Sequence, residues 1–239
     1  MGIIKDLFKK KYVVRAHRFS VKKIHNISMS VEGKKYVISN ISMSGVGLNS
    51  SALSSTEKEN DEILLTLQIG GDTFDVLARI VRIKGDFIGL AITGHLKKYE
   101  QNVKKFFQGE INALKLVKRE SKELIADYGE EIEWFYSDDF HELVSKTKGE
   151  TLIFFRINYQ GLIFNYDTQV GLKTFQVIDS LEKEVETKLG SNIEIMSFDI
   201  QNPQMFLYVI RFIDAATILE NSTRNQIIEA LEISKSKLI

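Results

Sequence analysis

The chain contains no cysteine, a single proline and no apolar segment long enough to cross a bilayer. Without cysteine there can be no disulfide, no thiolate zinc site and no cysteine nucleophile, and such a composition fits a reducing compartment. A transmembrane helix needs roughly 20 consecutive apolar residues, and the apolar stretch within Met1–Phe8 is too short for a secretory signal peptide. We therefore expect a cytoplasmic protein with no transmembrane segment.

Charge is balanced over the whole chain but distributed unevenly along it. The sequence has 32 basic and 32 acidic residues, for a formal net charge of zero. Residues 1–24 nevertheless hold eight Lys or Arg residues and one Asp. Such a segment is either a solvated tail or an arm that binds a phosphate-bearing partner. We expect residues 1–11 to form a basic N-terminal tail.

Short strand patterns separated by glycine turns fill residues 34–95. The apolar run Ile63–Ile69 ends at the turn pair Gly70-Gly71, and residues 74–83 broadly alternate between apolar and polar side chains. A second turn at Gly85-Asp86 leads into the expected strand at 87–92. Several short strands joined in this way predict a small antiparallel β-barrel.

From about residue 97 the spacing of apolar residues changes from two to three or four. The side chains from Val103 to Val117 follow this spacing, which predicts an amphipathic helix after the barrel. Residues 120–145 are acidic and of mixed helical character, so we place the domain boundary at their start. We therefore expect a barrel with its C-terminal helix over residues 12–118 and a second domain over 119–239.

Residues 119–239 predict an α+β domain whose role the sequence leaves open. We expect strands at Thr151–Ile157, Leu162–Tyr166, Ile193–Ile200 and Met205–Ile213. We expect helices over Phe175–Leu189, ended by Gly190, and from Asn221 onward. The predicted fold class is therefore α+β, with a small antiparallel β-barrel followed by an α+β domain.

Three features of the first half occur in a recognisable order. A basic segment with arginines, Tyr12–Val21, precedes Asn40-Ile41-Ser42-Met43-Ser44-Gly45, which has the pattern Asn-x-Ser-x-x-Gly. The expected strands that contain Leu77–Ile83 and Ile88–Leu90 follow. Together these features resemble the PilZ domain, the bacterial receptor module for cyclic di-GMP. The resemblance covers residues 12–105, less than half of the chain.

These residue types suit a ligand with two phosphates and two guanines. A guanidinium can donate in parallel to guanine O6 and N7, stack on the base and neutralise a phosphate. Asn and Ser side chains can hydrogen-bond a base edge or a phosphate, and Gly permits close approach. The resemblance implies that Arg15, Arg18, Asn40, Ser42 and Gly45 bind cyclic di-GMP. The alternative is that Asn40 and Gly45 merely serve a turn.

The arginine segment departs from the family pattern Arg-x-x-x-Arg. Arg18 fits the second position, but Val14 occupies the first, and Arg15 lies one residue later. Either a flexible arm lets Arg15 make the missing contact, or the site is degenerate and binds weakly or not at all. Losing one bidentate arginine–guanine pair costs about 1–3 kcal/mol, roughly ten- to a hundredfold in affinity.

The resemblance implies a bacterial second-messenger signalling protein that is not an enzyme. Nucleotide binding would order the arm and change how the barrel meets the second domain or a protein partner. We expect cyclic di-GMP and an unidentified protein as partners, and we expect no cofactor, DNA or RNA. The sequence does not decide between a monomer and a homodimer. The alternative is a protein-interaction adaptor that keeps the barrel but has lost nucleotide binding.

Other chemistry has weaker support in the sequence. The motifs of serine hydrolases, P-loop nucleotidases and dinucleotide-binding enzymes are absent. The four histidines are scattered singly, and the carboxylates at Glu130–Asp139 lack the spacing and glycine of a calcium loop. We therefore expect no catalytic residues and no metal site.

Overall fold

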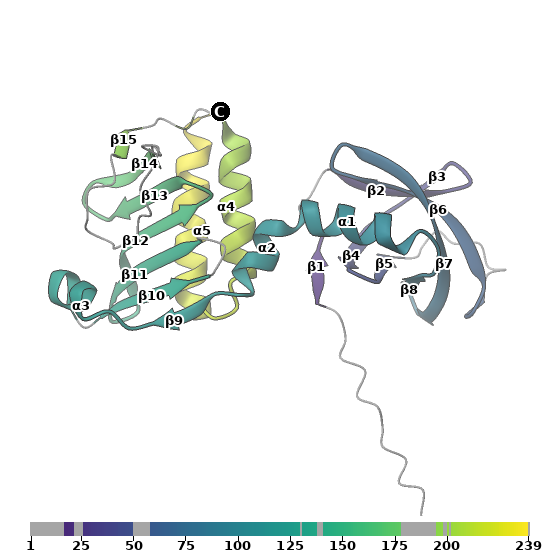
Figure 1. Cartoon of the computed structure of the whole chain (residues 1–239), viewed down its shortest axis with the longest axis horizontal. Coiled ribbons are helices and arrows are strands. Elements are labelled where there is room, and N and C mark those ends of the chain that lie inside the picture. The colour runs from purple at the N-terminus through teal and green to yellow at the C-terminus, as the bar shows by residue number, and fades with distance from the viewer. Residues whose placement is uncertain are drawn as a thin grey trace, which may run out of the picture. The chain divides into compact units, whose positions relative to one another are not determined.

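The computed structural model describes residues 17–21, 26–49, 58–129, 131–137, 141–177, 195–197, 200 and 202–238. The chain forms two compact units, Met1–Phe106 and Phe107–Ile239, which are drawn in Figure 1. Each unit has one antiparallel sheet with helices, which confirms the α+β class. The units divide after Phe106, earlier than the boundary that we expected after residue 118. No helix among the described residues is long and apolar enough to span a bilayer.

The first unit contains an eight-stranded antiparallel sheet with the order β1-β4-β5-β8-β7-β6-β2-β3. Its strands are β1 (Arg18–Ser20), β2 (Ile27–Val31), β3 (Lys34–Tyr36), β4 (Ile38–Ser42), β5 (Gly45–Asn49), β6 (Glu62–Ile69), β7 (Asp72–Lys84) and β8 (Phe87–Ile92). Strands β6 and β7 are strongly curved in Figure 1, and the sheet curls into a half-barrel. The barrel-like part that the sequence predicts is therefore present.

Alternation of side chains gives this sheet an apolar inner face and a polar outer face. Ile41, Val46, Ile80 and Leu90 are all buried, and each has a polar residue, a glycine or an alanine beside it along the strand. Because successive residues of a strand point to opposite faces, the residues between these apolar ones lie on the outer face. The inner face also packs against α1 (Leu96–Phe106), whose buried side chains include Tyr99.

The helix that we expected from Val103 to Val117 is interrupted in the structure. α1 ends at Phe106, α2 covers Gln108–Ala113, and Val117 already belongs to β9 (Val117–Arg119). Gly109 lets α2 pack closely, since a Cβ there would lie 2.7 Å from the Tyr159 hydroxyl. Tertiary packing therefore divides one continuous apolar pattern between three elements.

The second unit is a seven-stranded meander with the order β15-β14-β13-β12-β11-β10-β9. Besides β9, its strands are β10 (Ile132–Tyr136), β11 (Glu142–Lys148), β12 (Thr151–Tyr159), β13 (Leu162–Asp167), β14 (Gly171–Val177) and β15 (Ile195–Ser197). Its further helices are α3 (Lys122–Tyr128), α4 (Pro203–Ala215) and α5 (Asn221–Ser236). The strands expected at Thr151–Ile157 and Leu162–Tyr166 and the helix expected from Asn221 are confirmed.

Helices α4 and α5 cover one face of this sheet, as Figure 1 shows, and enclose the main apolar core. The strand expected at Met205–Ile213 is wrong, because these residues lie in α4. Asn202 caps the helix by accepting a hydrogen bond from the Gln204 amide at 2.9 Å, and Pro203 occupies its first turn. Phe206, Val209 and Phe212 then fall on one buried helical face.

The helix expected over Phe175–Leu189 also fails at its start. Phe175 lies in β14 and pairs with Ile163 of β13, so this segment begins as a strand. Residues 178–189 of the expected helix lie outside the described residues.

Candidate functional site

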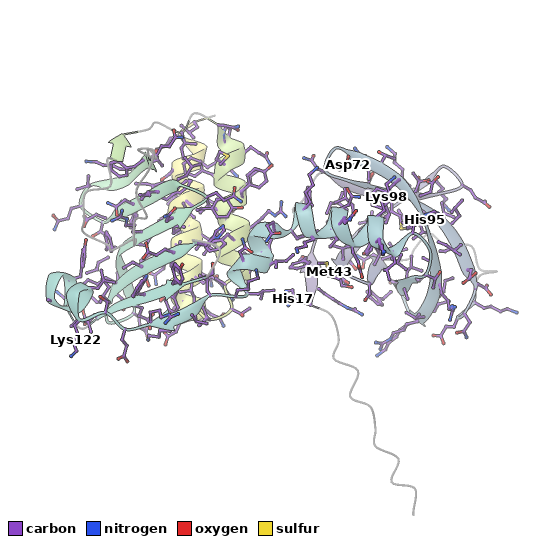
Figure 2. The ribbon with its side chains drawn as sticks, in the orientation of Figure 1. His17, Met43, Asp72, His95, Lys98 and Lys122 are labelled. Carbon is purple, nitrogen blue, oxygen red and sulfur yellow. The ribbon has the colours of Figure 1, made fainter. Side chains whose placement is uncertain are left out.

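The Asn-x-Ser-x-x-Gly segment forms strand β4, a two-residue turn and the start of strand β5. Ser42 and Gly45 face each other across the turn, and the Ser42 hydroxyl donates to the Gly45 carbonyl oxygen at 3.3 Å. The Ile92 amide donates to the Ser44 carbonyl oxygen at 2.9 Å. The motif is therefore a tight hairpin whose carbonyl oxygens are bound by the protein itself. Figure 2 labels Met43 in this turn.

Gly45 is required by the backbone of the neighbouring strand. It pairs with Ala91 of β8, and a Cβ at Gly45 would collide with the Leu90 carbonyl oxygen. The close approach that makes glycine necessary is thus between two strands of the sheet. This gives Gly45 a structural role whether or not a ligand binds.

Asn40 lies over Gly47 on the outer face of the sheet. The two residues are register partners, and a Cβ at Gly47 would be 2.7 Å from both the nitrogen and the oxygen of the Asn40 amide. The amide also donates to the Ser39 hydroxyl at 3.1 Å, and that hydroxyl donates to the Gly47 carbonyl at 3.0 Å. The Asn40 amide is therefore held in place beside the turn, with partly exposed surface.

Strand β1 brings the basic segment against the motif. It pairs antiparallel with β4, which places Arg18 opposite Ser42 and Ser20 opposite Asn40. Phe19 between them points inward and is buried, whereas Arg18 is exposed on the outer face. Of the five residues that the resemblance selects, four (Arg18, Asn40, Ser42 and Gly45) therefore lie together. Arg15 and Val14 lie outside the described residues, as does the tail over residues 1–11.

Helix α1 fixes the turn from the inner side of the sheet. The Tyr99 hydroxyl lies 2.7 Å from the Ser42 carbonyl oxygen and 2.9 Å from the Gly45 carbonyl oxygen, so its proton can be shared between them. Tyr99 is fully buried, and this burial raises the pKa of its hydroxyl far above the usual value. The hydroxyl consequently stays protonated and remains a donor throughout the ordinary pH range.

Two arginines of β7 lie on the same outer face, and the sequence analysis did not select them. Arg79 pairs with Ala91 and Arg82 with Gly89 of β8, the strand that adjoins β5. Both are exposed, and Arg79 makes an ion pair with Glu62 at 3.6 Å. The signal that could have found them is the pairing of β7 with β8, because it places these arginines on the face that carries the motif.

The second unit has a buried ion pair, and its described part shows no cluster of side chains that could hold a metal ion. Arg211 of α4 contacts Glu110 of α2 at 2.5 Å through two guanidinium nitrogens. Burial raises the pKa of Glu110 although the Arg211 charge opposes this shift. Within the described ranges, no group of three or more His, Asp or Glu residues could hold a metal ion. Glu130, Asp138 and Asp139 lie outside those ranges.

Comparison with known proteins gives matches to solved structures, and two of these show a weak likeness to the chain. The sequence matches no protein-family model and no curated protein. An uncharacterized Legionella protein, Lpg0364, is 20% identical, with a TM-score of 0.34, and the match covers 40% of this chain and 99% of that one. The PilZ domain of CeSA from a cellulose-synthesizing bacterium is 15% identical, with a TM-score of 0.27, and the match covers 39% of this chain and 97% of that one. At these values neither likeness assigns a function to this chain.

Proposed function

We propose that the first unit binds cyclic di-GMP on the outer face formed by β1, β4 and β5. In this proposal the protein is a non-catalytic cytoplasmic receptor, and the second unit passes the signal to a protein partner. Binding would order the basic segment before β1 against the sheet. The ordered segment would then change how the first unit meets the second unit or a protein partner.

One observation carries this proposal. The pairing of β1 with β4 places the exposed Arg18 opposite Ser42, and Asn40 is the next residue on that face. The Arg18 guanidinium beside the Asn40 amide offers several donors to the acceptor atoms of a guanine or a phosphate, whereas the Ser42 hydroxyl already donates to the Gly45 carbonyl oxygen. Arg18, Asn40, Ser42 and Gly45, four of the five residues that the resemblance selects, are thus neighbours in the sheet, and this supports the proposal.

Isothermal titration calorimetry with cyclic di-GMP tests the proposal directly. The wild-type protein is expected to bind, and Arg18→Ala is expected to lose roughly ten- to a hundredfold in affinity, since one bidentate arginine contact contributes about 1–3 kcal/mol. Arg119→Ala, an exposed arginine on β9 of the second unit, is the matched control and should bind as the wild type does. The absence of heat for the wild type at high micromolar ligand would exclude the receptor function.

The same titration tests whether Arg15 makes the arginine contact that Val14 cannot make. Arg15→Ala is expected to weaken binding as Arg18→Ala does. Equal affinities for Arg15→Ala and the wild type would show that Arg15 makes no such contact and would leave the receptor function in place.

A second candidate function is a protein-interaction adaptor that does not bind nucleotide. The observation that favours it is Val14, which cannot donate to guanine, at the position where the family pattern has arginine. Under this alternative neither the wild type nor any arginine variant responds to cyclic di-GMP. Affinity capture of a partner that is unaffected by added nucleotide would then support the adaptor.

A further inference from the structure

Two cross-strand rows continue the candidate site beyond the motif. Register partners place Ser20, Asn40, Gly47, Gly89 and Arg82 in one row across β1, β4, β5, β8 and β7. The neighbouring row consists of Arg18, Ser42, Gly45, Ala91 and Arg79. Since directly paired residues of a sheet share one face, Arg82 and Asn40 lie on the same side.

The positions between Arg82 and Asn40 along their row carry no side chain of their own, although the Phe87 ring and the Val81 side chain flank Gly89, each 3.7 Å from the place of a Cβ there. The two intervening positions are Gly47 and Gly89, and the Asn40 amide already lies over Gly47. Neighbouring strands are about 4.8 Å apart, so the two strand steps from Gly47 to Arg82 span roughly 10 Å. An arginine side chain that extends toward Gly47 can cover part of this distance.

Arg82 also differs from Arg79 in its charge partners. Arg79 is engaged with Glu62, whereas none of the ion pairs among the described residues involves Arg82. The Arg82 side chain is exposed on the outer face, and the strand irregularity between Ile80 and Arg82 keeps it in register with Gly89. Its guanidinium is therefore available to a ligand bound beside Asn40.

We propose that Arg82 is a further ligand-binding residue of the cyclic di-GMP site and contacts the part of the nucleotide that extends from Asn40 toward β7. The proposal rests on the proposed function of this face. A ligand with two guanines and two phosphates presents acceptor atoms at both ends, so Arg18 and Arg82 can bind it from opposite sides of the glycine positions. A second barrel arginine would also supply a guanidinium contact in a chain whose basic segment has Val14 in place of arginine.

Titration calorimetry of Arg82→Gln with cyclic di-GMP tests this inference. We expect a loss of tenfold or more in affinity, with an unchanged thermal unfolding midpoint, because the side chain is exposed. Lys84→Gln removes the same charge from the same strand and should stay within twofold of the wild type. Arg82→Lys keeps the charge but not the planar guanidinium, so an intermediate loss is expected.

A parallel titration with cyclic di-AMP distinguishes a contact of Arg82 with guanine from a contact with phosphate. Guanine offers O6 and N7 as acceptors, whereas adenine replaces O6 with an amino donor. If Arg82 binds guanine, Arg82→Gln narrows the preference for cyclic di-GMP over cyclic di-AMP, and if it binds phosphate, both affinities fall alike. Either result supports the inference.

Three outcomes separate this inference from the proposed function. A wild type that does not bind cyclic di-GMP overturns both. If Arg82→Gln binds cyclic di-GMP as tightly as the wild type does, the proposed role of Arg82 is overturned and the receptor function stands. Equal losses in Arg82→Gln and Lys84→Gln also overturn it, because they would indicate a general charge effect.

Discussion

The Tyr99 hydroxyl of α1 lies 2.7 Å from the carbonyl oxygen of Ser42, a residue 57 positions earlier in the chain. This contact joins a buried helix residue to the turn that carries the candidate binding site. The strands and the helix therefore depend on each other for the geometry of the site.

Tyr99→Phe is expected to lower the free energy of unfolding by about 1–3 kcal/mol, the cost of leaving buried acceptors without a donor. Tyr208→Phe is the matched control, since Tyr208 is 38% exposed and should change stability little. Urea denaturation of both variants measures the difference. Equal midpoints and slopes for Tyr99→Phe and the wild type would contradict the assigned role of the hydroxyl.

Gly45→Ala should be destabilising even without ligand. The added methyl group meets the Leu90 carbonyl oxygen, so β5 and β8 must move apart, and such overpacking typically costs about 1–3 kcal/mol. Gly71→Ala is the control, because a Cβ at Gly71 has no atom within 4 Å. A thermal unfolding midpoint for Gly45→Ala that matches that of Gly71→Ala would show that the strands tolerate the methyl group.

Trp134, the single tryptophan of the chain, should report the ionisation of Glu142. Its indole nitrogen donates to the Glu142 carboxylate at 2.7 Å, and burial raises the pKa of Glu142 despite this bond and the nearby Arg156 charge. Tryptophan emission is therefore expected to titrate above the ordinary glutamate value of 4.5. Glu142→Gln should abolish this transition, and Glu133→Gln should retain it.

The same group predicts a pH dependence of stability. Because the pKa of Glu142 is higher in the folded than in the unfolded chain, its contribution is fully present below the unfolded pKa. It is lost as pH rises through the folded pKa. We therefore compare the free energy of unfolding of the wild type and of Glu142→Gln as pH rises from the unfolded to the folded pKa of Glu142. Relative to the variant, the wild type should lose stability over this interval. Parallel curves for the two proteins would refute the link.

Removal of Arg211 should be costly because Glu110 then lies buried without its cation. Replacing one partner of a buried ion pair typically lowers the free energy of unfolding by about 3–5 kcal/mol, whereas replacing both partners with apolar or neutral residues costs far less. Arg211→Met should thus be much less stable than the double variant Glu110→Gln/Arg211→Met in urea. Lys118→Met, which breaks the more exposed Lys118–Glu133 pair, should lose no more than about 1 kcal/mol.

The sequence by itself determined the local elements of the first unit. Alternation over residues 74–83, the apolar run Ile63–Ile69 and the glycine turns predict the strands correctly, because burial of one face forces a two-residue period. The motif also predicted which side chains gather, since Asn40, Ser42 and Gly45 belong to one hairpin. Local pattern was insufficient at Met205–Ile213, where residues that favour strands are helical because Asn202 and Pro203 begin a helix that packs on the sheet.

Tertiary structure alone decided the contacts between residues far apart in the chain. Strand pairing places Arg82 in the same row as Asn40, and folding brings Glu110 to Arg211 across 101 positions. A sequence pattern records which face of its own element a residue occupies. It does not record which element lies beside it, because that depends on the packing of the whole sheet.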